Sequence, residues 1–153
     1  MSVVRCLEVS LTIPDNEAET ALATLRRLGL ELGELHRADI YRVELDEPAA
    51  KKTLAGLRKL ETIYNPNKHR LNVRSETEPH EGEVWIDEPG PEATGDGSLS
   101  IAGKVLEGLR RIERFTAWRL LDAQGNPASP QTVTRASDLL LCNSAFQRAQ
   151  LSR

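Results

Sequence analysis

The first half of the chain alternates between a two-residue and a helical spacing of apolar positions. Apolar residues at every second position of residues 7–13 predict a half-buried strand, which Pro14 ends. Apolar residues three and four apart in residues 18–28 then predict a helix. Asp15 or Asn16 can cap the start of this helix by accepting a hydrogen bond from a free backbone N–H in its first turn.

The same half continues with a further strand, a second helix and a last strand. Residues 35–45 carry apolar side chains on one face and are long enough to fold back as a hairpin. Pro48 suits the first turn of a helix over residues 48–60, and alternation resumes in residues 69–74. An antiparallel sheet with both helices on one face is typical of this order, so the sequence predicts an α+β, ferredoxin-like half.

The second half resembles a degenerate copy of the first, and two local matches support a duplication. Leu25-Arg26-Arg27-Leu28 parallels Leu109-Arg110-Arg111-Ile112, and Ile63-Tyr64-Asn65-Pro66 parallels Leu141-Cys142-Asn143-Ser144. The expected elements are a strand at about 83–87, an amphipathic helix over 99–112, a strand over 115–121 and a last helix through 139–141, capped by Ser137. Residues 1–75 and 83–153 are therefore predicted to be two ferredoxin-like repeats packed together.

Residues 76–98 form an acidic, Gly- and Pro-rich connector that overlaps the first strand of the second repeat. Between Glu76 and Asp96 the chain has eight acidic residues and no Lys or Arg. The whole chain of 153 residues has a formal net charge of −3, which gives no case for binding nucleic acid or a membrane surface. No stretch has the roughly 18 apolar residues of a membrane span, and no signal peptide is apparent. Cys6 and Cys142 match no metal or redox spacing, so we expect a cytoplasmic protein with reduced thiols.

A search for catalytic chemistry finds no motif with the required spacing. The three histidines, His36, His69 and His80, have no paired ligand, and the chain has no P-loop, no G-x-G-x-x-G and no G-x-S-x-G. The sequence thus predicts a protein that is not an enzyme on its own and uses no metal or cofactor. Two other groups remain as candidate interaction sites. Arg26, Arg27, Arg110 and Arg111 form either a solvated surface or a basic contact face, whereas Trp85 and Trp118 are either core residues or interface anchors.

Several short motifs resemble PurS, the small subunit of bacterial and archaeal phosphoribosylformylglycinamidine synthase. The family opens with an alternating strand, and its first helix ends in a pattern similar to Leu25-Arg26-Arg27-Leu28-Gly29. Residues 35–45 are similar to its second strand, although Asp39-Ile40 replaces the family's Gly-Lys. Its second helix closes on L-L-A-N-P, which Ile63-Tyr64-Asn65-Pro66 and Leu140-Leu141-Cys142-Asn143-Ser144 both resemble, and residues 103–109 are similar to the start of its first helix. The resemblance covers residues 3–74 and, more loosely, 83–151 of a chain twice the usual family length.

The resemblance implies a tandem PurS-like structural subunit without catalytic residues. Such a subunit bridges the synthetase (PurL-like) and glutaminase (PurQ-like) subunits in de novo purine biosynthesis, and self-association is left open. Asn65, Pro66 and Asn143 would lie at the ends of the second helices, in a turn or a contact role. The alternative is a ferredoxin-like regulatory module that binds a small metabolite between its two repeats.

Overall fold

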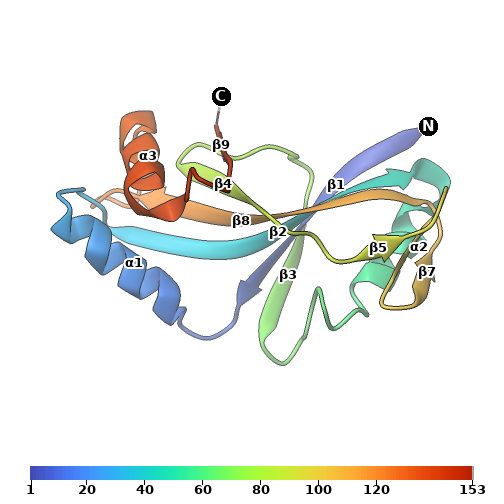
Figure 1. Cartoon of the computed structure of the whole chain (residues 1–153). Coiled ribbons are helices and arrows are strands. Elements are labelled where there is room, and N and C mark those ends of the chain that lie inside the picture. The colour runs from blue at the N-terminus through green and yellow to red at the C-terminus, as the bar shows by residue number, and fades with distance from the viewer. Residues whose placement is uncertain (153) are drawn as a thin grey trace. The chain divides into compact units, whose positions relative to one another are not determined.

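The computed structural model describes residues 1–152, and these residues have an α+β fold with three α-helices and two antiparallel sheets (Figure 1). The larger sheet has the order β3-β1-β2-β8-β4-β9. Its strands, in that order, are His69–Arg74, Ser2–Leu11, Glu34–Asp46, Leu109–Leu121, Glu83–Glu88 and Ala149–Leu151. The smaller sheet, β5-β6-β7, comprises Ala93–Thr94, Leu99–Ile101 and Lys104–Leu106. The helices are α1 (Asn16–Arg27), α2 (Ala50–Leu57, after the 3-10 turn Glu47–Ala49) and α3 (Pro130–Ala136, followed by the π-helical turn η2, Ser137–Leu141).

These elements form two compact units, and each unit is built from three separate stretches of the chain. Unit 1 comprises Met1–Thr12, Asp39–Thr77 and Pro89–Arg114. Unit 2 comprises Ile13–Ala38, Glu78–Glu88 and the chain from Phe115 onward. Strands β2 and β8 contribute residues to both units.

The core of unit 1 lies between its strands, α2 and the small sheet. Alternation along β1 directs Leu7 and Val9 to this side, where they join Tyr41, Val43 and Leu45 of β2. These residues pack with buried side chains of α2, the turn after it, the small sheet and β8, namely Leu57, Leu60, Ile63, Ile101, Leu106 and Leu109. The Thr53 hydroxyl, buried on α2, donates a hydrogen bond to the Glu107 carbonyl and ties the helix to the end of β7.

The core of unit 2 lies between α1, α3 and the strand segments of that unit. Figure 1 shows both helices beside the first half of β2. Asp15 caps α1 as predicted, because its side chain accepts hydrogen bonds from the backbone N–H groups of Glu17 and Ala18 at 3.1 and 3.2 Å. Buried residues of the helices and strands make up the rest of the core, among them Leu25, Leu35, Val84, Ile86, Leu120 and Val133.

The predicted helix over residues 99–112 is wrong, because this stretch forms β6, β7 and the first part of β8. Ala102 and Gly103 both have positive φ, 53° and 77°, and connect Ile101 directly to Lys104. Positive φ at both central residues is the geometry of the two-residue turns that join antiparallel strands. The apolar residues three and four apart therefore belong to two short strands, β6 and β7, and to the start of β8, and their spacing resembles that of a helix by coincidence.

Three further expectations differ from the structure. β2 is one strand of 13 residues rather than a hairpin. The last helix begins earlier than predicted, at Pro130, and Ser129 rather than Ser137 caps it by accepting from the Thr132 N–H at 3.3 Å. Residues 25–28 end α1 and residues 109–112 begin β8, so this local match does not join equivalent positions.

The strand expected at about 83–87 is confirmed as β4, with Val84 and Ile86 buried. The repeat boundaries at 1–75, 76–98 and 83–153 stay a prediction.

Among residues 1–152, none of the helices combines the length and the apolar character needed to cross a membrane.

Candidate functional site

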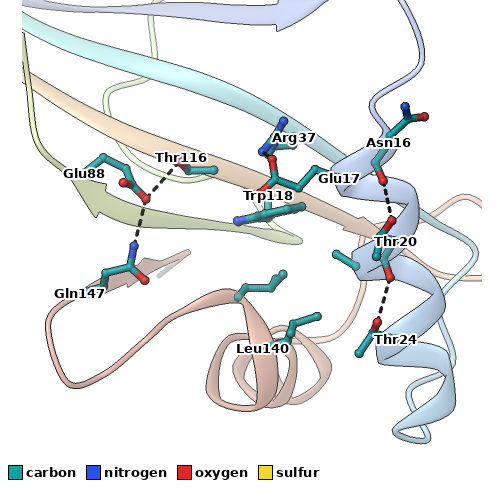
Figure 2. A pocket seen from close by; sticks show the side chains of 12 residues that line it. Asn16, Glu17, Thr20, Thr24, Arg37, Glu88, Thr116, Trp118, Leu140 and Gln147 are labelled. Carbon is teal, nitrogen blue, oxygen red and sulfur yellow. Dashed lines mark hydrogen bonds and ion pairs between the residues drawn. The ribbon is translucent and has the colours of Figure 1, made fainter.

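Unit 2 contains a cleft of about 550 Å³ between α1, the strands and η2, which we call the α1–β8 cleft (Figure 2). The residues that define it are Glu17 on α1, Arg37 on β2, Glu88 on β4, Trp118 on β8, Leu140 on η2 and Gln147 in the loop before β9. Its volume is in the range of small-molecule sites, roughly 300–1,000 Å³.

Arg37 and Trp118 form one wall of the cleft. The Arg37 guanidinium carbon lies 5.8 Å from the centre of the Trp118 ring, within the range of a cation–π contact. The same guanidinium donates to both Asp15 carboxylate oxygens, at 2.8 and 3.1 Å, and to Glu17. Burial alone would lower the pKa of Arg37, but these hydrogen bonds and charges outweigh it and hold the pKa above its ordinary value.

Glu88 lies on the other side of the cleft, and two donors hold its carboxylate. Its Oε1 accepts hydrogen bonds from the Thr116 hydroxyl at 3.3 Å and from the Gln147 side-chain amide at 3.1 Å (Figure 2). Thr116 belongs to β8, so strand pairing fixes one donor and the loop before β9 supplies the other. The carboxylate is thus oriented before any ligand arrives.

Asn143, a predicted site residue, builds the turn that positions Gln147. The Asn143 side chain accepts from the Ala145 N–H at 3.1 Å, and its carbonyl accepts from the Phe146 and Gln147 N–H groups at 3.1 and 2.7 Å. The Gln147 side-chain oxygen accepts from the Asn143 N–H at 2.8 Å. Asn143 therefore has a turn role, and it contributes to the cleft through Gln147.

Asn65 builds the corresponding turn in unit 1. Its side chain accepts from the Asn67 N–H at 2.9 Å, and its carbonyl accepts from the Lys68 and His69 N–H groups at 3.0 and 2.8 Å. The His69 Nδ1 accepts from the Asn65 N–H at 3.0 Å. Pro66 is the second residue of this turn, and Ser144 has the same position in the other.

The two tryptophans have different environments, although both lie in strands of unit 2. Trp85 is fully buried and packs against Phe115, with ring centres 5.4 Å apart and planes tilted by 38°. Trp118 is also mostly buried but lines the α1–β8 cleft. Trp85 is thus a core residue, and Trp118 is the tryptophan that a ligand can reach.

Arg26 and Arg27 lie in the last turn of α1, in unit 2. The Arg26 guanidinium donates to the Leu32 and Gly33 carbonyls, both at 2.9 Å, and so fixes the loop that leads into β2. Arg27 is exposed, and its guanidinium lies 3.4 Å from the Thr24 hydroxyl.

Arg110 and Arg111 open β8 in unit 1. Arg110 pairs with both carboxylate oxygens of Asp46, at 3.1 and 2.8 Å, and the hydrogen bond from Arg110 lowers the pKa of Asp46. Arg111 is exposed and lies 3.3 Å from Glu113. Because the two arginine pairs belong to different units, a common basic face stays a prediction.

Unit 1 has a cleft of its own, of about 530 Å³, lined in part by Asp39, Tyr41 and Arg114. Burial and the charge of Asp39 raise the pKa of Tyr41, while Arg114 acts in the opposite direction. Arg114 lies 3.4 Å from Asp39. The positive charge in this cleft is therefore already paired.

The described residues contain no group of three or more His, Cys, Asp or Glu side chains placed to hold a metal ion. Cys6 is fully buried, and Cys142 is partly buried with a pKa that burial raises above the ordinary value of a thiol. A raised pKa reduces the thiolate fraction that a nucleophile needs.

No protein-family model and no curated protein matches the chain.

Proposed function

We propose that the protein is a non-catalytic structural subunit of the PurS kind, with two ferredoxin-like repeats in one chain. It bridges the synthetase and glutaminase subunits of phosphoribosylformylglycinamidine synthase in de novo purine biosynthesis. The observation that carries the proposal is the pair of matching turns at Asn65 and Asn143, the first between α2 and β3 and the second between η2 and β9. These are the positions where the sequence resembles the family's helix end.

The strand order of the larger sheet also supports two repeats. Read inward from either edge, the strands are the third, first and second of their half: β3, β1, β2 and β9, β4, β8. The middle strands β2 and β8 each have 13 residues, and each is followed by a helix with proline in or next to its first turn. Along the chain, the small sheet β5-β6-β7 lies between β4 and β8 in the second half, as α1 lies between β1 and β2 in the first.

The bridging role is tested by size-exclusion chromatography with light scattering. The chain is run alone and with the synthetase and glutaminase subunits of its own organism, in the presence of glutamine and nucleotide. We expect co-elution of all three proteins and loss of glutamine-dependent synthesis when this chain is omitted. If neither partner changes its elution, the bridging role is wrong.

A matched pair of variants then asks whether the turn at Asn143 contacts a partner. Phe146 lies in this turn with 76% of its surface exposed, and Val105 on β7 is comparably exposed at 68%. Phe146→Ser should weaken co-elution if the turn forms part of the interface, whereas Val105→Ser removes a similar apolar group elsewhere. Equal co-elution of the two variants with the wild type would place the interface on another surface.

The α1–β8 cleft favours a second candidate, a module that binds a small metabolite. Glu17 and Arg37 come from the first predicted repeat, and Glu88, Trp118 and Gln147 come from the second. The cleft thus supplies the converging polar side chains that such a module needs. A thermal-shift screen of metabolites tests this candidate, with Trp118→Phe expected to reduce the shift of any compound that binds there. If no compound shifts the melting temperature, the metabolite-binding module is wrong.

A further inference from the structure

The α1–β8 cleft combines one oriented carboxylate, an already neutralised guanidinium and an apolar wall. We infer that the cleft binds a primary ammonium group carried on an aliphatic chain. This inference rests on the second candidate function, since it names the class of metabolite, and does not depend on the bridging role.

Glu88 selects the kind of cation. Its Oε1 already accepts two hydrogen bonds, from Thr116 and Gln147, whereas its Oε2 has no hydrogen-bond partner among residues 1–152. A guanidinium binds carboxylates best through two parallel bonds that occupy both oxygens. An ammonium is a compact charge that needs a single oxygen on the carboxylate. The free Oε2 therefore suits a primary amine.

The remaining charges in the cleft disfavour an anion. Arg37 is the only Lys or Arg that lines the cleft within the described residues, and it is paired with both Asp15 and Glu17. Two carboxylates already surround this one guanidinium, and Glu88 adds a third negative charge. The net charge at the cleft is thus negative, which attracts cations and repels carboxylates or phosphates.

The apolar wall accounts for the aliphatic part of the ligand. Trp118, Leu140 and Leu141 line the cleft, and Leu140 remains 41% exposed. Figure 2 shows the Trp118 ring between Glu88 on one side and α1 on the other, with Leu140 below it. A chain that starts at Glu88 can therefore cover Trp118 and Leu140. Because burying one methylene favours binding, each added CH₂ should tighten binding by up to about fourfold until the wall is covered.

The test is an NMR titration of the full chain with n-propylamine, n-butylamine and n-pentylamine at neutral pH. The readout is the indole N–H signal of Trp118, with the fully buried Trp85 as the internal reference. 1-Pentanol and pentanoate are the neutral and anionic controls of equal length. We expect saturable shifts at Trp118 with the amines alone, and an affinity that rises from propyl to pentyl.

Variants identify the charge that is responsible. Glu88→Gln keeps the shape and an acceptor for Thr116, and should weaken amine binding by about tenfold or more, since a hydrogen bond to a charged group is lost. Glu31→Gln removes the same charge from an exposed position in unit 2 and should leave the affinity unchanged. The dispersion of the backbone amide signals shows whether each variant is folded.

Three results would overturn the inference: pentanol shifting Trp118 as strongly as pentylamine, pentanoate binding in place of the amine, or Glu88→Gln binding as tightly as the wild type. In the first two cases the cleft still binds a small molecule, so the metabolite-binding candidate survives while the ammonium assignment fails. If neither the amines nor any compound of the thermal-shift screen binds, both fail together.

Discussion

Asn65 and Asn143 occupy two turns with the same set of hydrogen bonds. In each turn the side chain accepts from the N–H two residues on, and the carbonyl accepts from the N–H groups three and four residues on. In each turn the side chain of the fifth residue, His69 or Gln147, accepts from the asparagine N–H. A histidine nitrogen and an amide oxygen thus accept the same hydrogen bond at equivalent positions. This agreement is far more specific than the short sequence match that first suggested it.

Replacing either asparagine by alanine should destabilise the protein through loss of one turn hydrogen bond. We expect Asn65→Ala and Asn143→Ala each to lower the free energy of unfolding by about 0.5–1.5 kcal/mol. Asn→Asp at the same positions keeps the acceptor and should recover most of the loss. Urea denaturation measures these differences. Asn67→Ala is the matched control, because Asn67 takes part in the turn through its backbone N–H alone. A loss as large in Asn67→Ala as in Asn65→Ala would contradict the assigned role of the side chain.

Gly108 and Gly103 form a natural comparison, since both have positive φ, 79° and 77°. Alanine at either position should cost about 1–2 kcal/mol for the left-handed backbone. A Cβ at Gly103 meets no atom within 4 Å, whereas a Cβ at Gly108 would lie 2.9 Å from the Ala49 Cβ. Gly108→Ala should therefore lose at least about 1 kcal/mol more than Gly103→Ala, because crowding adds to the backbone strain. Equal midpoints in urea for the two variants would show that Ala49 moves aside without cost.

Trp85→Ala should be among the most destabilising single substitutions in the chain. Trp85 is fully buried against Phe115, and truncation of a buried aromatic residue costs about 3–5 kcal/mol. This is a large part of the roughly 5–15 kcal/mol that stabilises an ordinary domain. Phe146→Ala removes an aromatic ring that is 76% exposed and should change stability by less than about 0.5 kcal/mol. Thermal and urea unfolding measure the stability of both variants. Similar losses of unfolding free energy in Trp85→Ala and Phe146→Ala would contradict the prediction.

Cys142 should react slowly with iodoacetamide at neutral pH. Burial and the charges of Asp138 and Asp87 raise the pKa of this thiol, so a smaller fraction is thiolate than in a free cysteine. The rate should rise as the pH increases toward the raised pKa. Asp138→Asn removes one negative charge, lowers the pKa and should speed the reaction, whereas the exposed Asp96→Asn should have no effect. Mass spectrometry separates Cys142 from Cys6, which is fully buried and should react after unfolding. A faster reaction than that of a free thiol would contradict the raised pKa.

The sequence predicts α1 and the part of β1 around Leu7 and Val9 because local pattern and local capping agree there, but β1 begins earlier than predicted, at Ser2, and ends at Leu11. Leu7 and Val9 alternate with polar residues on a half-buried strand, and Asp15 caps the helix that follows. Residues 99–112 are mispredicted because short strands around Gly103 and Gly108 place their apolar residues at a helical spacing. The two glycines are the signal against a helix, since each lies in its interior and costs about 1 kcal/mol relative to alanine.

The α1–β8 cleft could not be derived from any local motif. Its residues come from α1, three strands, η2 and the loop before β9, and they converge through tertiary packing alone. The sequence singles out Trp118 as one of only two tryptophans, but no local pattern predicts a site at Glu88 or Gln147. The match between Asn65 and Asn143 is the sequence feature that points to Gln147, because the residue four positions on has a hydrogen-bonding side chain in both turns.

The division of both units into three separated stretches has a consequence for how the protein is made on the ribosome. Unit 1 needs Pro89–Arg114, so the chain must be synthesised as far as Arg114 before this unit is complete. Unit 2 needs the chain from Phe115 onward and is therefore completed after unit 1. A nascent chain stalled near residue 75 would hold parts of both units and all of neither, and would expose apolar strand faces to chaperones.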